Sequence, residues 1–220
     1  MARIIEEEGQ PIIGELFREL RSVELQKDPH RFRENLRLIG TALGWEIGKT
    51  LEAREEVVTT PLGERTLSRI AKPPVMMLIL RAAAPLWEGM SLVLRNSPTA
   101  VVAAERVEDG GPADDLGMGV RLTYSGIVDC DQRDWIFVDP MIATGSTILD
   151  VHRLLCARGM HPRRFIVAGA IGYRGGVERL EKEIPGVEVF LASCDEELNE
   201  QGYIVPGLGD AGDLAFGAKI

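Results

Sequence analysis

The sequence predicts an α/β protein in which helices flank a central, mostly parallel sheet. Five short apolar runs, bounded by polar or proline-containing segments, have the length and composition of buried strands. Helical patterns separate several of these runs, and strands that alternate with helices build a parallel sheet covered on both faces. The 220 residues suffice for one substantial domain, and no repeat or linker divides them. We therefore expect a single domain over residues 1–220.

The first element expected is an N-terminal helical arm over roughly residues 10–56. Apolar side chains recur there at steps of three and four residues, namely Phe32, Leu36, Ile39, Leu43 and Ile47. This spacing places them on one face of a helix that must be buried. An arm of this kind often packs on a neighbouring domain or subunit.

The sheet and its covering helices are expected after this arm. The predicted strands cover residues 75–80, 99–104, 134–139, 164–171 and 187–192, and the predicted helices cover 85–95, 147–158 and 176–183. The stretch ERVEDGGPADDLGMGVRLTYSG, residues 105–126, breaks the alternation. Because it is rich in Gly and Asp, it predicts a long loop or an exposed hairpin over the sheet edge, and such segments are often functional lids.

Composition excludes several classes of function. A formal net charge of -9 repels phosphodiester backbones, so nucleic-acid binding is not expected. No signal-peptide stretch opens the chain and no apolar run approaches bilayer length, which predicts a cytoplasmic protein without a membrane partner. The widely spaced Cys130, Cys156 and Cys194 predict buried free thiols. The three histidines form no metal motif, and His152 is expected on the surface of a helix.

The stretch VDPMIATGST, residues 138–147, has the layout of a phosphate site: a strand, an acid, a turn of small residues and a helix. Ligands of open parallel sheets lie beyond the carboxyl ends of the strands. Gly145 lets the backbone approach a ligand closely, and the N–H groups of residues 143–147 can converge on phosphate oxygens. Thr144, Ser146 and Thr147 add hydroxyl groups.

Residues alone leave an equally good alternative for this turn. Ser146 or Thr147 could simply cap the helix that follows. The stretch is not a Walker loop, because the Lys after the glycines is missing, and it is not a Gly-x-Gly-x-x-Gly turn.

Two further stretches bear on the same sheet end. DEELNEQGYIVPGLGDAGDLAFG, residues 195–217, is either a flexible tail or an ordered loop, and its interleaved aromatic and branched residues favour the ordered loop. In LILRAAAPLWEG, Arg81 follows a predicted strand. It is either a surface charge or, beside a phosphate loop, a contact for pyrophosphate.

Together these stretches resemble a known family. VDPMIATGST resembles the phosphoribosyl-pyrophosphate (PRPP) loop of type I phosphoribosyltransferases, and its Asp-Pro is similar to the uracil phosphoribosyltransferase branch. LNEQGYIVPGLGDAGD is similar to that branch's uracil-binding segment almost residue for residue. TPLGE and LILRA resemble further family landmarks in the expected order. The resemblance runs from about residue 15 to the end of the chain.

This resemblance implies a type I phosphoribosyltransferase fold with a lid hairpin at about 106–128 and a base-binding segment at about 195–217. It implies an enzyme of pyrimidine salvage that transfers ribose 5-phosphate from PRPP to uracil, with Mg²⁺, giving UMP and pyrophosphate. Its partners would be these small molecules and further copies of the chain, as a homodimer or a higher homo-oligomer. It leaves open whether GTP acts as an allosteric activator.

The resemblance also implies roles for individual residues. The expected catalytic residues are Asp139 on the ribose hydroxyls, Arg81 and Arg106 on pyrophosphate, and Asp210 through a Mg²⁺-bound water. The expected PRPP and 5′-phosphate residues are Asp139, Met141, Ala143, Thr144, Gly145, Ser146 and Thr147. The expected uracil-binding residues, acting largely through the main chain, are Tyr203, Ile204, Gly209, Asp210 and Ala211.

The chain departs from the family pattern mainly on the pyrophosphate side. Ala83 and Pro85 stand where the family has glycines, whose backbone freedom Ala and Pro lack. Val107 replaces an acid, Leu214 an Arg and Ser22 an Asp, and a lid Lys has no counterpart in residues 121–129. An alternative is therefore a paralogue with impaired catalysis or a changed substrate that binds uracil or UMP as a regulatory protein.

Overall fold

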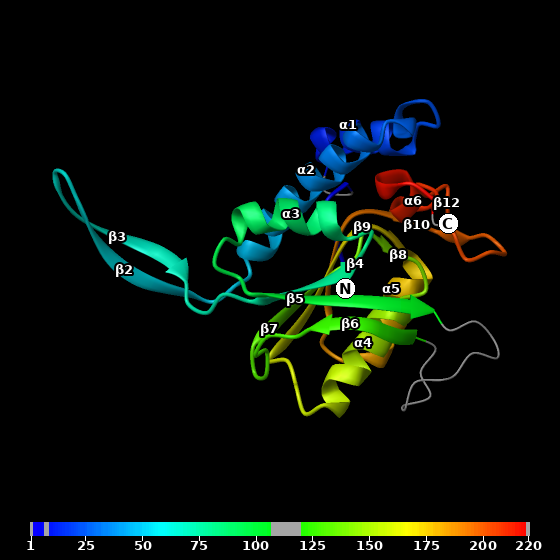
Figure 1. Ribbon diagram of the computed structural model, residues 1–220. Coiled ribbons are helices and arrows are strands. Elements are labelled where there is room, and N and C mark those ends of the chain that lie inside the picture. The colour runs from blue at the N-terminus through cyan, green and yellow to red at the C-terminus, as the bar shows by residue number, and fades with distance from the viewer. Residues whose placement is uncertain (1, 7–8, 107–119, 219–220) are drawn as a thin grey trace.

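The computed structural model describes residues 2–6, 9–106 and 120–218, with side chains described outside 104–125 (Figure 1). An eight-stranded sheet runs in the order β1-β10-β9-β7-β4-β5-β6, and β8 pairs with β9. All its pairings are parallel except that of β5 with β6. The strands are β1 (Arg3–Ile4), β4 (Val75–Leu80), β5 (Thr99–Arg106), β6 (Val120–Gly126), β7 (Asp134–Val138), β8 (Met141–Ile142), β9 (Arg164–Tyr173) and β10 (Glu188–Asp195). The predicted mostly parallel sheet is confirmed.

Helices cover both faces of this sheet. They are α1 (Pro11–Arg21), the short 3-10 helix η2 (Leu25–Lys27), α2 (Pro29–Gly48), α3 (Ala84–Val93), α4 (Ser146–Ala157), α5 (Arg174–Glu183) and α6 (Ala211–Phe216). One core cluster joins α1, α2, α3 and α6 to Met76 and Leu78 of β4, and a second joins α4 and α5 to Val75, Met77 and Ile79. Alternate residues of β4 thus point to opposite faces, as the pleat of a strand requires.

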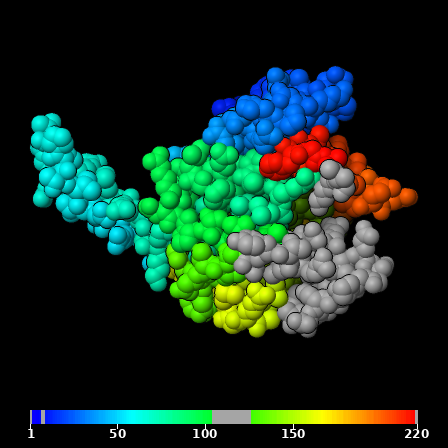
Figure 2. All heavy atoms as spheres, in the orientation of Figure 1, coloured from blue at the N-terminus to red at the C-terminus, as the bar shows by residue number. Residues whose placement is uncertain are grey.

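The expectation of helix throughout residues 10–56 is wrong at its end. Helix α2 ends at Gly48, and β2 (Ala53–Thr60) pairs with β3 (Gly63–Ile70) in a separate antiparallel hairpin. The β-branched run from Val57 to Thr60 and the turn at Pro61-Leu62 favour strands over helix. The hairpin projects away from the rest of the molecule (Figures 1 and 2).

The other irregular segments are partly ordered into strands. Within the predicted loop or hairpin at 105–126, β5 continues to Arg106 and β6 returns antiparallel to it, so the described ends form a hairpin at the sheet edge. Residues 107–119, including Val107, lie outside the described residues. Near the C-terminus, β11 (Glu197–Leu198) pairs with β12 (Ile204–Val205), which supports an ordered loop there.

His152 is not a surface residue, contrary to the expectation. It is half-buried on α4, with its ring centroid 4.7 Å from that of Phe165 and 6.3 Å from that of Trp135. Burial, and then the nearby Arg153 charge, lower the pKa of His152 below its ordinary value. The cysteines are free, with Cys130 buried and Cys156 and Cys194 half-buried. In the described part of the chain, no helix combines the length and apolarity needed to span a bilayer.

Candidate active site

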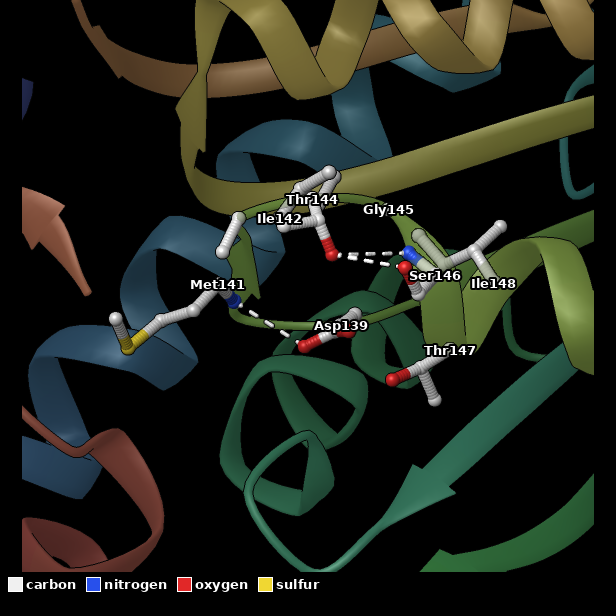
Figure 3. A pocket seen from close by; sticks show the side chains of 9 residues that line it. Asp139, Met141, Ile142, Thr144, Gly145, Ser146, Thr147 and Ile148 are labelled. Atoms are coloured by element: carbon white, nitrogen blue, oxygen red, sulfur yellow. Dashed lines mark hydrogen bonds between the residues drawn. The ribbon is translucent and has the colours of Figure 1, made fainter. Parts of the chain in front are cut away.

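A pocket of about 240 Å³, counting space open to solvent, lies beyond the carboxyl end of β7 (Figure 3). It is lined by Asp139, Met141, Ile142, Ala143, Thr144, Gly145, Ser146, Thr147 and Ile148. All seven residues expected around the ribose 5-phosphate group are among them. The structure therefore gathers this part of the predicted site into one concave surface.

The first half of the loop is anchored on strand β9. The Asp139 N–H donates to Ala168 O at 3.1 Å, and Pro140 O accepts the N–H of Ile171 at 3.0 Å. The Asp139 side chain turns back into the loop, where Oδ1 accepts the Met141 N–H at 3.2 Å. These bonds explain why a buried strand ends in Asp-Pro: the acid and the proline carbonyl start the loop on a fixed support.

The second half of the loop depends on Gly145. Its φ of 72° is left-handed, and an added Cβ would lie 2.9 Å from Leu180 Cγ, so this position requires glycine. Gly145 is itself the N-cap of α4, and no side chain caps that helix. The alternative that Ser146 or Thr147 serves as the cap is therefore wrong.

Two of the loop hydroxyls are close to each other at the start of α4. Thr144 Oγ1 lies 3.0 Å from Ser146 Oγ and also accepts the Ser146 N–H at 3.4 Å. Figure 3 shows the Asp139 carboxylate directed toward the Met141 N–H and the Thr147 side chain at the other end of the loop. The pocket combines backbone amides, hydroxyl groups and one carboxylate, which suits a phosphorylated sugar.

Helix α5 supports the loop from outside and brings a cation that the sequence did not indicate. Gly176 packs so closely that an added Cβ would lie 1.8 Å from Ala143 O. One turn along, Arg179 Nη1 donates to Ser146 Oγ at 2.9 Å and to Thr144 O at 3.2 Å. No sequence signal links these residues, which lie more than 30 positions apart.

Arg81 lies at the carboxyl end of β4, on the same sheet edge as Asp139. Its Nη2 is 2.7 Å from Asp213 Oδ1, and its Nε is buried without a hydrogen-bond partner among the described residues. An added Cβ on Gly212 would be 3.6 Å from Arg81 Nε and 3.2 Å from Asp210 Oδ1. The structure thus brings Arg81 beside Asp210, and it adds Asp213, which was not among the predicted site residues.

Ala83 and Pro85 occupy ordinary backbone in this structure. Ala83 is the N-cap of α3 with φ of -74°, and Pro85 lies in the first turn, where a proline costs the helix no hydrogen bond. The peptide bond between Leu80 and Arg81 is cis. Neither substituted position needs the left-handed conformation that glycine alone adopts readily.

The expected base-binding residues surround the start of α6. Ile204 and Ala211 are buried with their side chains in the core, whereas the Tyr203 ring is half-exposed. Tyr203 donates its N–H to Asn199 Oδ1 at 2.9 Å, and its carbonyl accepts the Asn199 N–H at 2.9 Å. Gly209 has a left-handed φ of 86°.

Asp210 is the N-cap of α6, and Leu214 lies within that helix. Asp210 Oδ1 accepts the Asp213 N–H at 2.9 Å and so caps α6. Leu214 packs against the core beside this segment. The side chain of Arg106, the last residue of β5, lies outside the described side chains.

No ready-made metal cage accompanies these residues. In the described ranges 2–6, 9–106 and 120–218, no three or more His, Cys, Asp or Glu side chains are grouped to hold a metal ion. Among the described residues, Asp139, Asp210 and Asp213 are acids that lie near Arg81 or the pocket at this edge.

Comparison with known proteins places the chain in a family. The model of the uracil phosphoribosyltransferase family matches residues 8–218. A uracil phosphoribosyltransferase of Thermococcus gammatolerans is 39% identical over 97% of this chain and 92% of its own length. That of Pyrococcus furiosus is also 39% identical, over 97% of this chain and 89% of its own length.

Solved structures agree in fold. The AQ2163 protein from Aquifex aeolicus superposes with a TM-score of 0.84 at 26% identity, with all of both chains covered. A hypoxanthine phosphoribosyltransferase from Staphylococcus aureus, 12% identical, has a TM-score of 0.50 over 80% of this chain and 85% of its own. The expected phosphoribosyltransferase fold is therefore confirmed, and the chain belongs to the uracil phosphoribosyltransferase family.

Proposed function

We propose that the protein transfers the 5-phosphoribosyl group of PRPP to uracil, giving UMP and pyrophosphate. The observation that carries this proposal is the pocket around residues 139–148, where one carboxylate, three hydroxyl side chains and a helix N-terminus face a common space. A segment similar to the family's uracil-binding segment packs against the same core as Met141 and Ala143. Family membership supplies the substrate class.

The reaction breaks the bond from ribose C1 to pyrophosphate and forms the bond from C1 to uracil N1, whose proton passes to solvent. The ribosyl centre gains oxocarbenium character, so the protein must hold the ring still and stabilise the departing negative charge. Asp139 accepts hydrogen bonds from the ribose hydroxyls. The amides of residues 143–147 and the hydroxyls of Thr144, Ser146 and Thr147 hold the 5′-phosphate, and the Arg179 charge beside them favours an anion.

Pyrophosphate is expected on the other side of the ribose, against Arg81 and Arg106. Arg81 is paired with Asp213, so pyrophosphate would compete with that carboxylate for the guanidinium. Uracil lies along the main chain of residues 203–211, with Ile204 and Gly209 the central positions. The Tyr203 main chain is already bonded to Asn199, and its ring, which is partly exposed, is free to contact a base.

Mg²⁺ is expected to bind together with PRPP. Magnesium usually keeps several waters and binds substrate phosphates together with one or two carboxylates, and it does not need an all-protein cage. The absence of a chelating cluster among the described residues fits that mode, and Asp210 Oδ2 would hold a metal-bound water. When bound, the ion neutralises charge on pyrophosphate. GTP as an activator remains an untested expectation.

We also propose a homo-oligomer. The projecting hairpin exposes Val57, Leu62 and Leu67, with Leu62 fully exposed, and the outer face of α2 exposes Leu38 and Trp45. A two-stranded hairpin alone in water is only marginally stable, so a second copy that covers it would stabilise it. Sedimentation of the wild type beside a Val57→Ser, Leu67→Ser variant tests this, and a wild-type monomer would refute it.

The proposed activity is tested with PRPP, Mg²⁺ and radiolabelled uracil. The wild type should form labelled UMP, and Asp139→Asn should reduce turnover severely while unfolding at the same temperature as the wild type. Asp129→Asn, an exposed acid away from the pocket, is the matched control and should keep full activity. A wild type that binds PRPP but forms no UMP would contradict the proposal. Ala83 and Pro85, which motivated the alternative of a regulatory paralogue, offer no support for it here.

A further inference from the structure

Three side chains of the N-terminal helices donate hydrogen bonds to main-chain carbonyls of the C-terminal segment. Arg21 Nη1 at the end of α1 donates to Gly207 O at 3.3 Å, and Arg33 Nη1 of α2 donates to Ala215 O at 2.6 Å. The Gln26 amide faces two carbonyls, and when its nitrogen is assigned to that side it donates to Leu208 O and Leu20 O at 3.0 Å each. The N-terminal arm thus holds this chain's own base-binding segment.

Arg21 also makes a charge-assisted pair beside this segment. Its guanidinium pairs with both oxygens of Asp195, at 2.7 Å from Nη1 to Oδ2 and 2.9 Å from Nη2 to Oδ1. Nη2 also donates to Ser193 Oγ at 3.0 Å, and Ser193 Oγ donates in turn to Glu6. The Arg21 side chain is 24% exposed and that of Asp195 only 9%, so water screens this bidentate pair weakly.

The Arg21–Asp195 pair forms hydrogen bonds with both the carbonyl and the N–H of Gly207. Besides the bond from Arg21 to Gly207 O, the Gly207 N–H donates to Asp195 Oδ2 at 2.8 Å. Gly207 has a left-handed φ of 61°, and an added Cβ would lie 1.9 Å from Ile204 O. The peptide groups on both sides of Gly207 are therefore held in one orientation, directly between Ile204 and Gly209.

We propose that Arg21 is a positioning residue for the base: through Asp195 and Gly207 it sets the main-chain orientation that uracil meets between Ile204 and Gly209. This inference rests on the function proposed above. Recognition by main-chain groups requires the peptide planes to be held before the ligand arrives, because a small misorientation weakens each hydrogen bond. A salt bridge from α1 provides that hold without touching the ligand.

The test compares Arg21→Gln with Arg18→Gln. Arg18 lies one turn earlier on α1 and makes exposed contacts with Glu15 and Glu19. The control substitution Arg18→Gln therefore removes the same charge from the same helix. Calorimetry measures binding of ribose 5-phosphate, which probes the phosphate loop alone, and of UMP, which probes the loop and the base segment. Initial rates give KM for uracil and KM for PRPP separately.

Arg21→Gln should weaken the binding of UMP about tenfold or more, which is a loss of about 1.4 kcal/mol or more in binding free energy. The affinity for ribose 5-phosphate should stay within about twofold of the wild type, so the loss is confined to contacts with the base. The KM for uracil should rise to a similar extent with little change in the KM for PRPP. Arg21→Lys, which keeps the charge but loses the bidentate fork, should fall between the wild type and Arg21→Gln. Arg18→Gln should match the wild type in every measurement.

Loss of folded protein alone would lower the maximal rate and leave both KM values unchanged, so that result refutes positioning. Equal weakening of UMP and ribose 5-phosphate also refutes it. Gln26→Ala removes the donor to Leu208 O and Leu20 O and keeps the ion pair of Arg21 with Asp195. It therefore tests whether support of this segment from the N-terminal arm matters in a variant expected to fold, and an unchanged UMP affinity there would count against the proposal. If the wild type binds UMP but never forms it, the proposed reaction fails while the binding comparison still decides the role of Arg21.

Discussion

Substitution of Gly176 by Ala should displace the phosphate loop from a distance. Gly176 is in the first turn of α5 and does not line the pocket, yet an added Cβ would lie 1.8 Å from Ala143 O and 2.9 Å from Ala143 C. This is about half the 3.4–4 Å of an ordinary van der Waals contact. Both atoms belong to the main chain, so no side-chain rotation relieves the clash. Either α5 or the loop must move by more than an ångström.

The expected cost has two parts. Forcing an extra methyl group into packed structure destabilises a protein by about 1–3 kcal/mol. A misplacement of about 1 Å in groups that position a substrate can cost about 100-fold in rate. We therefore expect the kcat/KM for PRPP to fall about 100-fold in Gly176→Ala, together with weaker binding of ribose 5-phosphate, because the Ala143 and Thr144 amides no longer converge.

The assay measures UMP formation, calorimetric binding of ribose 5-phosphate and thermal unfolding for wild type and variant. Gly14→Ala is the control, since an added Cβ there has no heavy atom within 4 Å. Because Gly14 lies within α1, Gly14→Ala should stabilise the protein by up to about 1 kcal/mol and leave activity unchanged. A Gly176→Ala variant that binds ribose 5-phosphate like the wild type would refute the view that α5 holds the loop.

Three other variants test separate parts of the site and the core. Arg179→Gln should weaken the binding of ribose 5-phosphate about threefold to tenfold, because it removes the charge beside Ser146. A loss of UMP formation without this weaker binding would contradict the reasoning. Asp213→Asn should strengthen product inhibition by pyrophosphate about twofold to fivefold, since an exposed pair such as Arg81–Asp213 is worth up to ~1 kcal/mol. Weaker inhibition would instead mean that Asp213 orients Arg81. Because burial lowers the pKa of His152, the unfolded chain binds the extra proton, so the free energy of unfolding should decrease as pH falls through about 6.5, and urea titrations should find a smaller decrease in His152→Gln.

The turn at residues 139–147, proposed above to hold phosphate, could be located from the sequence because the residues that form it are contiguous. An apolar strand, an acid, small residues and a helix follow one another within residues 134–157, and parallel topology alone places such a turn at the ligand-binding edge. The strands of the parallel sheet were predictable for a related reason. Burial on both faces leaves an uninterrupted apolar run, which is visible without any knowledge of its neighbours.

The hairpin of β2 and β3 was not predicted, because the pattern of apolar and charged residues in that part of the sequence is ambiguous. The charged residues before Val57 continue the helical pattern of α2 for several positions. The hairpin buries almost none of its side chains, so it has no apolar alternation to distinguish it from a helix or a loop. The half-burial of His152 was missed because its aromatic neighbours, Trp135 of β7 and Phe165 of β9, lie outside α4 in the sequence.

By itself, the sequence determined the class of fold, the place of the strand-to-helix turn at residues 139–147 and the family, because periodicity and contiguous motifs are properties of neighbouring residues. The tertiary structure alone decided which side chains act together. Arg21 meets Asp195 across 174 positions, Arg81 meets Asp213 across 132, and Arg179 meets Ser146 across 33. Pairs so distant in the chain are joined only when the sheet order and the helix packing are set, and no local pattern carries that information.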